Sequence, residues 1–119
     1  MKTIIAGSRN INDYDLLKFV INDCPFEITE VVCGLANGVD KMGERWAIEN
    51  KIPVKYLSPD WNRFGKKAGI LRNEQMAEYA QALIYLWDGK SKGTKHMVDY
   101  AKKLCLKTHG AIFPEFIPK

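Results

Sequence analysis

The sequence lacks any apolar run that approaches the roughly 20 residues needed to cross a bilayer. Its first ten residues, MKTIIAGSRN, hold a short apolar segment that Arg9 and Asn10 interrupt, which does not match a signal peptide. It also has no lysine- and arginine-rich run of the kind that binds DNA. We therefore expect a cytoplasmic protein with no membrane partner. The modest net charge of +4 suits a small anionic ligand and is too small by itself to indicate nucleic acid, which we do not expect as a partner.

Cysteine and histidine are scarce. The three cysteines, Cys24, Cys33 and Cys105, form an odd set without a CxxC pair. This pattern argues against a disulfide framework and against a zinc site. We expect all three to be buried or half-buried thiols, and we expect neither a metal nor a cofactor.

What the sequence does contain is a regular alternation of apolar runs and amphipathic segments. The expected strands are residues 2–6, 30–33, 52–57, 82–87 and 107–113. The expected helices run from Asn12 or Asp13 to about Cys24, and over residues 38–50, 66–80 and 94–106, with an irregular stretch at 58–65. This order predicts a single domain over residues 1–119 of the α/β class, a Rossmann-like three-layer sandwich with a five-stranded parallel sheet. From that general architecture we take the strand order 3-2-1-4-5, and Pro53 favours an edge position for the third strand.

Three glycine-containing loops follow the first, second and fourth expected strands. Their candidate ligand-binding residues are Gly7, Ser8 and Arg9, then Gly34, Ala36, Gly38 and Asp40, then Ser91, Gly93 and Thr94. In a parallel sheet the carboxyl ends of the strands share one edge, and ligands bind there where the strand order reverses. Glycine allows close backbone approach, and the free N–H groups of a helix N-terminus bind phosphate. The loops therefore predict a phosphate site, to which Arg9 can add a bidentate contact.

Other candidates have competing interpretations. Arg72 and Asn73 can reach over the same sheet edge from the start of a helix, or they can be solvated while Met76 packs in the core. Asp60 and Trp61 can form a wall over the pocket, with Trp61 stacking on a base. Asp40 has three possible roles. It can cap its helix and stabilise the N-terminus through its negative charge, it can bind ribose hydroxyls, or it can link the helix to the neighbouring loop.

These motifs together resemble the SLOG superfamily of Rossmann-like domains, and most of all its small stand-alone bacterial and phage members. The resemblance rests on Gly7-Ser8-Arg9, Gly34-x-Ala36-x-Gly38-Val39-Asp40, Asp60-Trp61-x-x-x-Gly65, Ala68-Gly69-x-x-Arg72-Asn73-x-x-Met76 and Trp87-Asp88-Gly89-x-Ser91-x-Gly93-Thr94, and it covers nearly the whole chain. It implies a five-stranded core and a nucleotide pocket. The superfamily includes the LOG phosphoribohydrolases and the DprA DNA-processing proteins. From the dimers of LOG proteins, it also implies a homodimer or higher homo-oligomer.

One position departs from the LOG pattern. In LOG enzymes an arginine at the position of Arg72 and a glutamate just after the Gly-Thr pair cleave an N-glycosidic bond. Here His96 stands two residues after Thr94. Cleavage through an oxocarbenium-like state needs a carboxylate, and a charged histidine would act against it.

The leading hypothesis is therefore a domain that binds a nucleotide or nucleotide-derived ligand, of the ADP-ribose type or a nucleoside monophosphate, as a sensor or sequestering module. The alternative is a nucleotide N-glycosidase in which Arg72 is catalytic and the acid is Asp40, Glu74 or Asp99. A third reading, single-stranded DNA binding, would use Lys90, Lys92 and Lys95. The apolar segment 113–118 can be an interface or can cover the core of its own chain.

Overall fold

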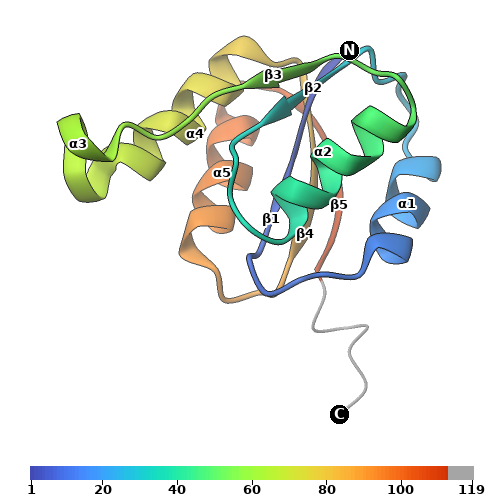
Figure 1. Cartoon of the computed structure of the whole chain (residues 1–119), viewed down its shortest axis with the longest axis horizontal. Helices are drawn as coiled ribbons and strands as arrows, with labels where there is room; N and C mark the ends of the chain where they lie inside the picture. The colour runs from blue at the N-terminus through green and yellow to red at the C-terminus, as the bar shows by residue number, and fades with distance from the viewer. Residues whose placement is uncertain (113–119) are drawn as a thin grey trace.

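Five parallel strands form the central sheet of the computed structural model, which describes residues 1–112 (Figure 1). The strands are β1 (Lys2–Gly7), β2 (Glu30–Cys33), β3 (Val54–Tyr56), β4 (Ala82–Trp87) and β5 (Lys107–Ile112). The helices are α1 (Tyr14–Asn22), α2 (Val39–Glu49), α3 (Trp61–Phe64), α4 (Ala68–Tyr79) and α5 (Lys92–Lys103), and a 3₁₀ turn, η1, spans Gly65–Lys67.

The strand order is β3-β2-β1-β4-β5, which confirms the predicted order and the α/β Rossmann-like class. All neighbouring strands pair in parallel, and β1 lies between β2 and β4. The chain builds outward from β1 to β3 on one side and then returns to place β4 against the other side of β1. The order therefore reverses between β1 and β4, and the loops that follow these two strands flank the point of reversal.

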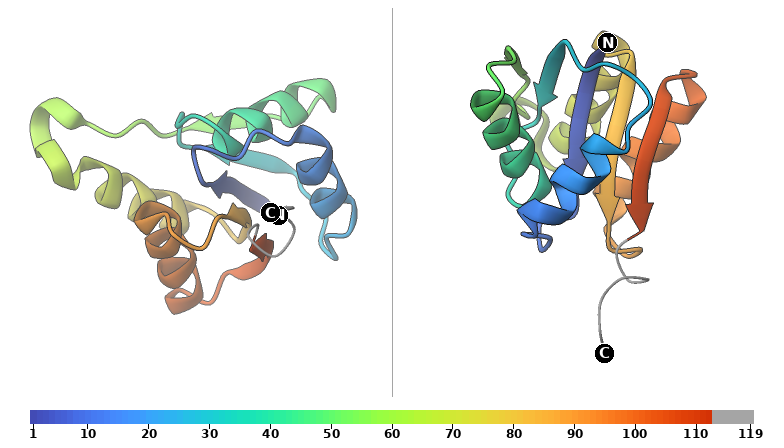
Figure 2. Two further views of the ribbon diagram at one scale, coloured as in Figure 1. Left: turned by 90° about the horizontal axis from the view of Figure 1, so that it is seen from below. Right: turned by 90° about the vertical axis from the view of Figure 1, so that its right-hand side faces the viewer.

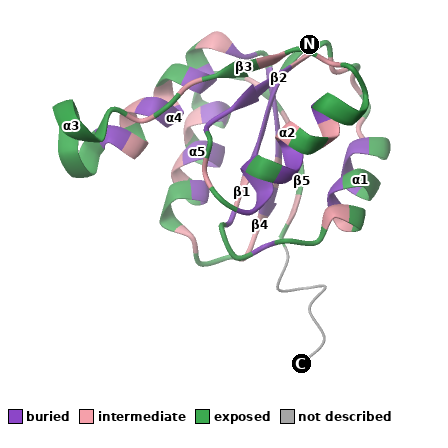
Figure 3. Ribbon diagram, in the orientation of Figure 1, coloured by how far each residue is buried: buried purple, intermediate pink, exposed green. Residues whose placement is uncertain are grey.

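Helices cover both faces of the sheet, as the two further views show (Figure 2). Successive residues of a strand point to opposite faces, so Ile5 joins a core with Leu17 of α1 and Val39 of α2. Its neighbour Ile4 joins the other core with Met76 of α4 and α5 residues. Burial is accordingly concentrated along the inner strands and the sheet-facing sides of the helices (Figure 3).

The segment between β3 and α4 differs most from expectation. We expected residues 58–65 to be irregular, but Trp61–Phe64 form the short helix α3, because the Asp60 carboxylate accepts a hydrogen bond of 3.1 Å from the Arg63 N–H and caps it. Helix α4 then begins at Ala68, after η1. The arm formed by α3 and η1 extends away from the sheet at one end of the molecule (Figure 1).

Two smaller expectations were wrong in detail. Strand β3 begins at Val54 rather than Ile52, because the Ile52 N–H still closes the end of α2 through a 2.8 Å bond to the Ala47 carbonyl. It does lie at the sheet edge, as Pro53 indicated. Cys33 is buried and Cys24 half-buried, but Cys105 is exposed. Cys105 lies in the turn between α5 and β5, where its backbone is left-handed with φ of 62°.

Within residues 1–112, no helix has the length and apolar character required to span a membrane. The segment 113–118, for which we expected either an interface or a core-covering role, lies outside the described residues.

Candidate functional site

A cavity of about 380 Å³ lies at the carboxyl ends of β1 and β4. Its walls come from the loops after β1, β2 and β4 and from the facing sides of α4 and α5. The lining residues are Ala6, Gly7, Arg9, Asn10, Ala36, Asp40, Arg72, Asn73, Met76, Asp88, Ser91, Gly93, Thr94 and Met97. The three glycine-containing loops thus meet at one place, as the sheet order requires, and we call this space the first cavity.

The loop after β1 is held tightly against its neighbours. A side chain on Gly7 would meet the Leu86 carbonyl oxygen and would come within 2.7 Å of Val39 Cγ2, so only glycine fits between β4 and α2. Ser8 is buried, and its Oγ accepts a 3.0 Å hydrogen bond from the Asp88 N–H. This bond joins the loop after β1 to the loop after β4 and leaves Arg9 exposed at the cavity.

The loop after β4 prepares the N-terminus of α5. Asp88 Oδ1 accepts hydrogen bonds from the N–H groups of Lys90 and Ser91, both at 2.8 Å. Ser91 Oγ then caps the helix by accepting from the Thr94 N–H at 3.3 Å. A Cβ on Gly93 would have no heavy atom within 4 Å, so the first turn opens onto free space. N–H groups at such a helix end carry partial positive charge and bind anions.

The loop after β2 contributes a buried carboxylate. Asp40, 4% exposed, accepts a hydrogen bond of 3.4 Å from the Ala36 N–H, so it links its helix to this loop. Gly38 has φ of 74°, and a Cβ there would come within 2.6 Å of the backbone oxygens of Ser8 and Arg9. Gly38 therefore supports the site through packing of the loops, while Asp40 both links the loop and lines the cavity.

Arg72 and Asn73 are buried and face the loops from α4, so the expectation that this pair is solvated is wrong. The accompanying expectation that Met76 packs in the core is confirmed, since Met76 is fully buried. The Arg72 Nη1 donates to the Gly34 carbonyl, and its Nε donates to Asn73 Oδ1 at 3.1 Å. Asn73 Nδ2 in turn donates to the Gly93 carbonyl at 3.2 Å. This chain of bonds connects the loop after β2, helix α4 and the start of α5.

Burial dominates the electrostatics of the first cavity. It raises the pKa of Asp40 from 3.8 to about 6, although nearby Arg72 and the Ala36 N–H act in the opposite direction. It also lowers the pKa of Arg72, against the attraction of Asp40. The Asp40 carboxyl therefore changes its charge at about pH 6, in a cavity that Arg9 also lines.

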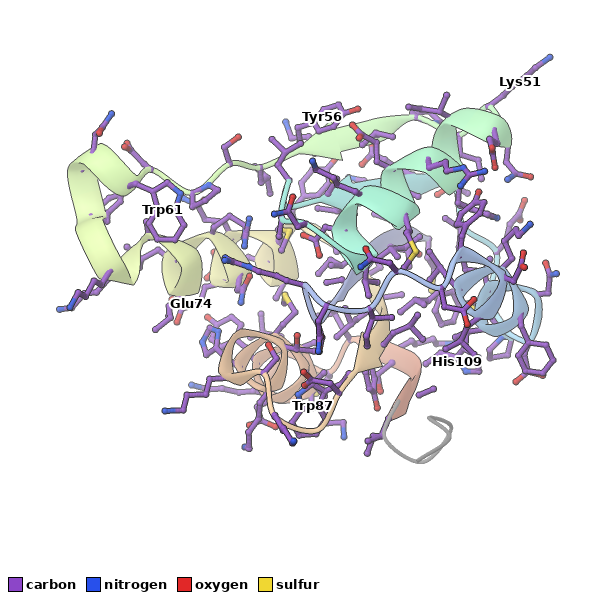
Figure 4. The ribbon with its side chains drawn as sticks, turned by 60° about the horizontal axis from the view of Figure 1, so that its bottom comes forward. Lys51, Tyr56, Trp61, Glu74, Trp87 and His109 are labelled. Atoms are coloured by element: carbon purple, nitrogen blue, oxygen red, sulfur yellow. The ribbon has the colours of Figure 1, made fainter. Side chains whose placement is uncertain are left out.

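A second cavity, of about 440 Å³, adjoins the first. It is lined by Arg9, Gly34, Leu35, Ala36, Asn37, Ser58, Pro59, Trp61 and Arg72. Trp61 projects from α3 toward α4, where its Cη2 lies 3.6 Å from the Cβ position of Gly69 (Figure 4). Asp60 lines neither cavity but a third hollow, together with Arg63 and Phe64; this hollow shares Ser58 and Arg72 with the second cavity. The predicted wall of Asp60 and Trp61 is thus divided, because Asp60 turns back to cap α3.

The other acidic candidates lie elsewhere. Glu74 Oε2 lies 3.7 Å from His96 Nε2, and Asp99 forms an ion pair of 2.6 Å with Lys95. Neither of these acids lines the first cavity. Asn10 and Asp88 also line the first cavity, although neither was a candidate site residue from the sequence. Asp88 carried a usable signal, since it directly follows a buried strand and precedes glycine. Among residues 1–112, no group of His, Cys, Asp and Glu side chains is arranged to hold a metal ion.

The sheet order defines a Rossmann-like α/β protein, and its first cavity lies at the strand reversal. Within that class, the chain belongs to the YspA, cpYpsA-related SLOG family (YAcAr), whose family model matches residues 1–64. This confirms the SLOG resemblance.

Two known proteins are similar to this chain. The Gene 61 protein of Mycobacterium phage D29 is 32% identical over 112 residues, which cover 86% of this chain and 89% of that protein. The X-ray structure of DNA processing protein A (DprA) from Streptococcus pneumoniae matches 90% of this chain with a TM-score of 0.72 at 19% identity. This chain spans about half, 48%, of that DprA chain, and the likeness shows a shared fold.

Proposed function

We propose that this chain binds a phosphorylated nucleoside in the first cavity, as a sensor or sequestering module. One observation carries the proposal: the open first turn of α5, around Gly93, lines the same cavity as Arg9 and Asp40. A helix N-terminus and a guanidinium are complementary to a phosphate, and a carboxylate is complementary to ribose hydroxyls. Family membership supports a nucleotide-related ligand.

The phosphate would lie at the N–H groups of the first turn of α5, within reach of the exposed Arg9. The remainder of the ligand would lie over Ala6, Met76 and Met97, which give the same cavity an apolar floor. Asp40 can accept hydrogen bonds from the sugar while Arg72, fixed by Gly34 and Asn73, limits repulsion between that carboxylate and the phosphate. The cavity volume of about 380 Å³ falls in the range of small-molecule sites, roughly 300–1,000 Å³.

Calorimetric titration with a panel of nucleoside monophosphates tests this proposal. We expect binding by at least one of them, and in Arg9→Ala an affinity lower by about tenfold or more, because a charge-assisted hydrogen bond is lost. Arg45→Ala is the matched control, since Arg45 is an exposed arginine on α2 that pairs with Glu49. Equal affinities for wild type and Arg9→Ala, or no binding across the panel, would contradict the proposal.

A gel-shift series with single-stranded DNA at rising salt belongs to the same test. DNA binding depends on counterion release and falls steeply with salt. A salt-sensitive shift without nucleotide binding would favour the DNA reading over ours.

A second candidate function is hydrolysis of the N-glycosidic bond of the bound nucleotide. It is favoured by Asp40, a carboxyl with pKa raised to about 6 by burial in the cavity that Arg72 also lines. In this reaction a water oxygen bonds to the anomeric carbon of ribose and the carbon–nitrogen bond breaks, leaving its electrons on the base. Protonated Asp40 would give the leaving base its proton and regain one from solvent, while the water releases its second proton to solvent.

Release of free base, followed by chromatography, tests this second candidate. The rate should fall as the pH rises above about 6, because Asp40 then loses the proton that it must donate. Asp40→Asn should retain nucleotide binding and abolish release. Binding without any release in wild-type protein between pH 5 and 8, roughly the range over which such a group titrates, would exclude the candidate.

A further inference from the structure

The first and second cavities meet at shared residues. Arg9, Ala36 and Arg72 line both, so the two spaces adjoin along one stretch of the carboxyl edge of the sheet. Each cavity alone, at about 380 Å³ and 440 Å³, lies near the lower end of the range for small-molecule sites. A ligand that used only the first would leave an adjoining cavity of similar size empty.

The second cavity has the character of a site for a flat ring. Its walls include the indole of Trp61, which is 53% exposed, and the side chain of Leu35, which is 45% exposed. Exposure of this much tryptophan surface beside a cavity is typical of binding sites. Asn37 and Ser58 add polar groups that can contact the edge of a ring.

The junction between the cavities carries positive charge. Among residues 1–112, Arg9 forms no ion pair, and the hydrogen bonds of Arg72 engage its Nε and Nη1 and leave its other terminal nitrogen available. A guanidinium recognises phosphate through paired N–H groups. The two arginines therefore suit a phosphate linkage that passes from one cavity into the other.

We propose that the ligand is a dinucleotide, in which two nucleosides are joined through phosphates. This inference rests on the proposed function. One nucleoside occupies the first cavity, the linking phosphates run from the start of α5 to Arg9 and Arg72, and the second base stacks on Trp61 in the second cavity.

The competing arrangement is a single nucleotide whose own base reaches Trp61. The two arrangements differ in what Trp61 contacts. A mononucleotide held in the first cavity lies against Met76 and Met97, while Trp61 lines the second cavity. Removing the indole should therefore spare a mononucleotide and weaken a dinucleotide.

The test titrates three ligands built on whichever nucleoside binds best. They are its monophosphate, its diphosphate, and the symmetrical dinucleoside diphosphate. The diphosphate supplies the second phosphate without the second base. We expect the dinucleotide to bind at least about tenfold more tightly than either of the others, since base–aromatic stacking contributes on that order.

Each ligand is then titrated into three variants. Trp61→Ala should lose most of the dinucleotide advantage and leave monophosphate affinity unchanged, whereas Trp61→Phe should restore part of the advantage. Phe64→Ala is the matched control, because Phe64 is an exposed aromatic on the same helix and lines neither the first nor the second cavity. Its affinities should equal those of wild type.

The outcomes separate this inference from the proposed function. Equal affinity for monophosphate and dinucleotide, or a Trp61→Ala variant that weakens both equally, overturns the dinucleotide assignment and leaves nucleotide binding in place. Absence of binding by every nucleoside monophosphate, diphosphate and dinucleotide tested overturns both.

Discussion

The Arg72 guanidinium and the Asp40 carboxylate both lie beside Gly34, and they form no direct ion pair with each other. A Cβ on Gly34 would lie 2.6 Å from Arg72 Nη1 and 3.0 Å from Asp40 Oδ2. Both charged groups therefore occupy the space that a side chain at position 34 would need. Arg72 instead donates to the carbonyl of Gly34. The absence of a side chain at this position therefore lets two opposite charges from different helices share one buried corner of the site.

Gly34→Ala should displace Arg72. The atoms that a methyl group would meet are the ends of flexible side chains, but the hydrogen bond of the buried Arg72 to Gly34 is broken, so we expect a stability loss of about 1–3 kcal/mol. The loss in the free energy of nucleotide binding should exceed the loss in the free energy of unfolding. Thermal unfolding and calorimetry on the same preparation measure both quantities.

Gly69→Ala is the control for that experiment. A Cβ there meets only Trp61 at 3.6 Å, an ordinary contact, and alanine favours the helix by roughly 0.5–1 kcal/mol. Its unfolding temperature should rise and its affinity for a mononucleotide should stay the same. If Gly34→Ala binds as tightly as Gly69→Ala, Arg72 has no part in holding the ligand.

Asp40→Asn should change how stability depends on pH. The pKa of Asp40 is about 6 in the folded protein against 3.8 when unfolded, so the folded state holds the proton more tightly. The contribution of this group to the free energy of unfolding is full below about pH 4 and is lost as the pH rises to about 6. The loss is on the order of 3 kcal/mol, from about 1.4 kcal/mol per pKa unit.

The measurement is thermal unfolding of both proteins between about pH 4 and pH 8, the span around those two pKa values. Asp40→Asn should gain stability relative to wild type as the pH rises. Asp88→Asn provides the contrast: burial raises the pKa of Asp88, but hydrogen bonds from the Ser91 and Lys90 backbone outweigh it and the net pKa is lowered below 3.8. Because that carboxyl is ionised in both the folded and the unfolded state over most of this pH span, the stability curve of Asp88→Asn should run parallel to that of wild type. Parallel curves for Asp40→Asn and wild type would show that Asp40 is not titrating in this range.

Ser8→Ala should loosen the connection between the loops after β1 and β4. The substitution removes the acceptor of the Asp88 N–H in a buried position, which costs about 1–3 kcal/mol. For a chain of this size we expect the unfolding temperature to fall by roughly 4 °C per kcal/mol. Ser58→Ala, at an exposed serine, should leave it unchanged; a similar fall in both variants would contradict the role of the Ser8 bond.

Asn73→Ala should weaken both the fold and the site. It removes the acceptor for Arg72 Nε and the donor to the Gly93 carbonyl, and so uncouples α4 from the start of α5. We expect a stability loss of about 1–3 kcal/mol together with lower nucleotide affinity. Gln75→Ala, at an exposed position of the same helix, is the control. Unaltered affinity in a destabilised Asn73→Ala would restrict Asn73 to a structural role.

The sequence allowed the sheet order and the meeting of the three loops to be predicted, because the alternation of strands and helices forces parallel pairing and places Gly7, Gly34 and Gly93 at one edge. It did not allow α3 to be predicted, since a four-residue helix has no periodicity and depends on the cap that Asp60 provides. The same local bond separated Asp60 from Trp61, which divided the expected wall. The exposure of Cys105 could not be predicted either. Cys105 lies in a left-handed turn, and a cysteine gives no indication of that backbone conformation.

The two cavities differ in how freely their walls can change over evolutionary time. Around the first, Gly7 and Gly38 touch backbone atoms of neighbouring segments, so drift there damages the fold itself. Around the second, Trp61 stands on an arm that projects from the sheet, where a new side chain disturbs little else. Descendants of this chain would therefore retain the residues around the first cavity nearly unaltered. They would acquire new ligand preferences through substitutions in the arm formed by α3 and η1.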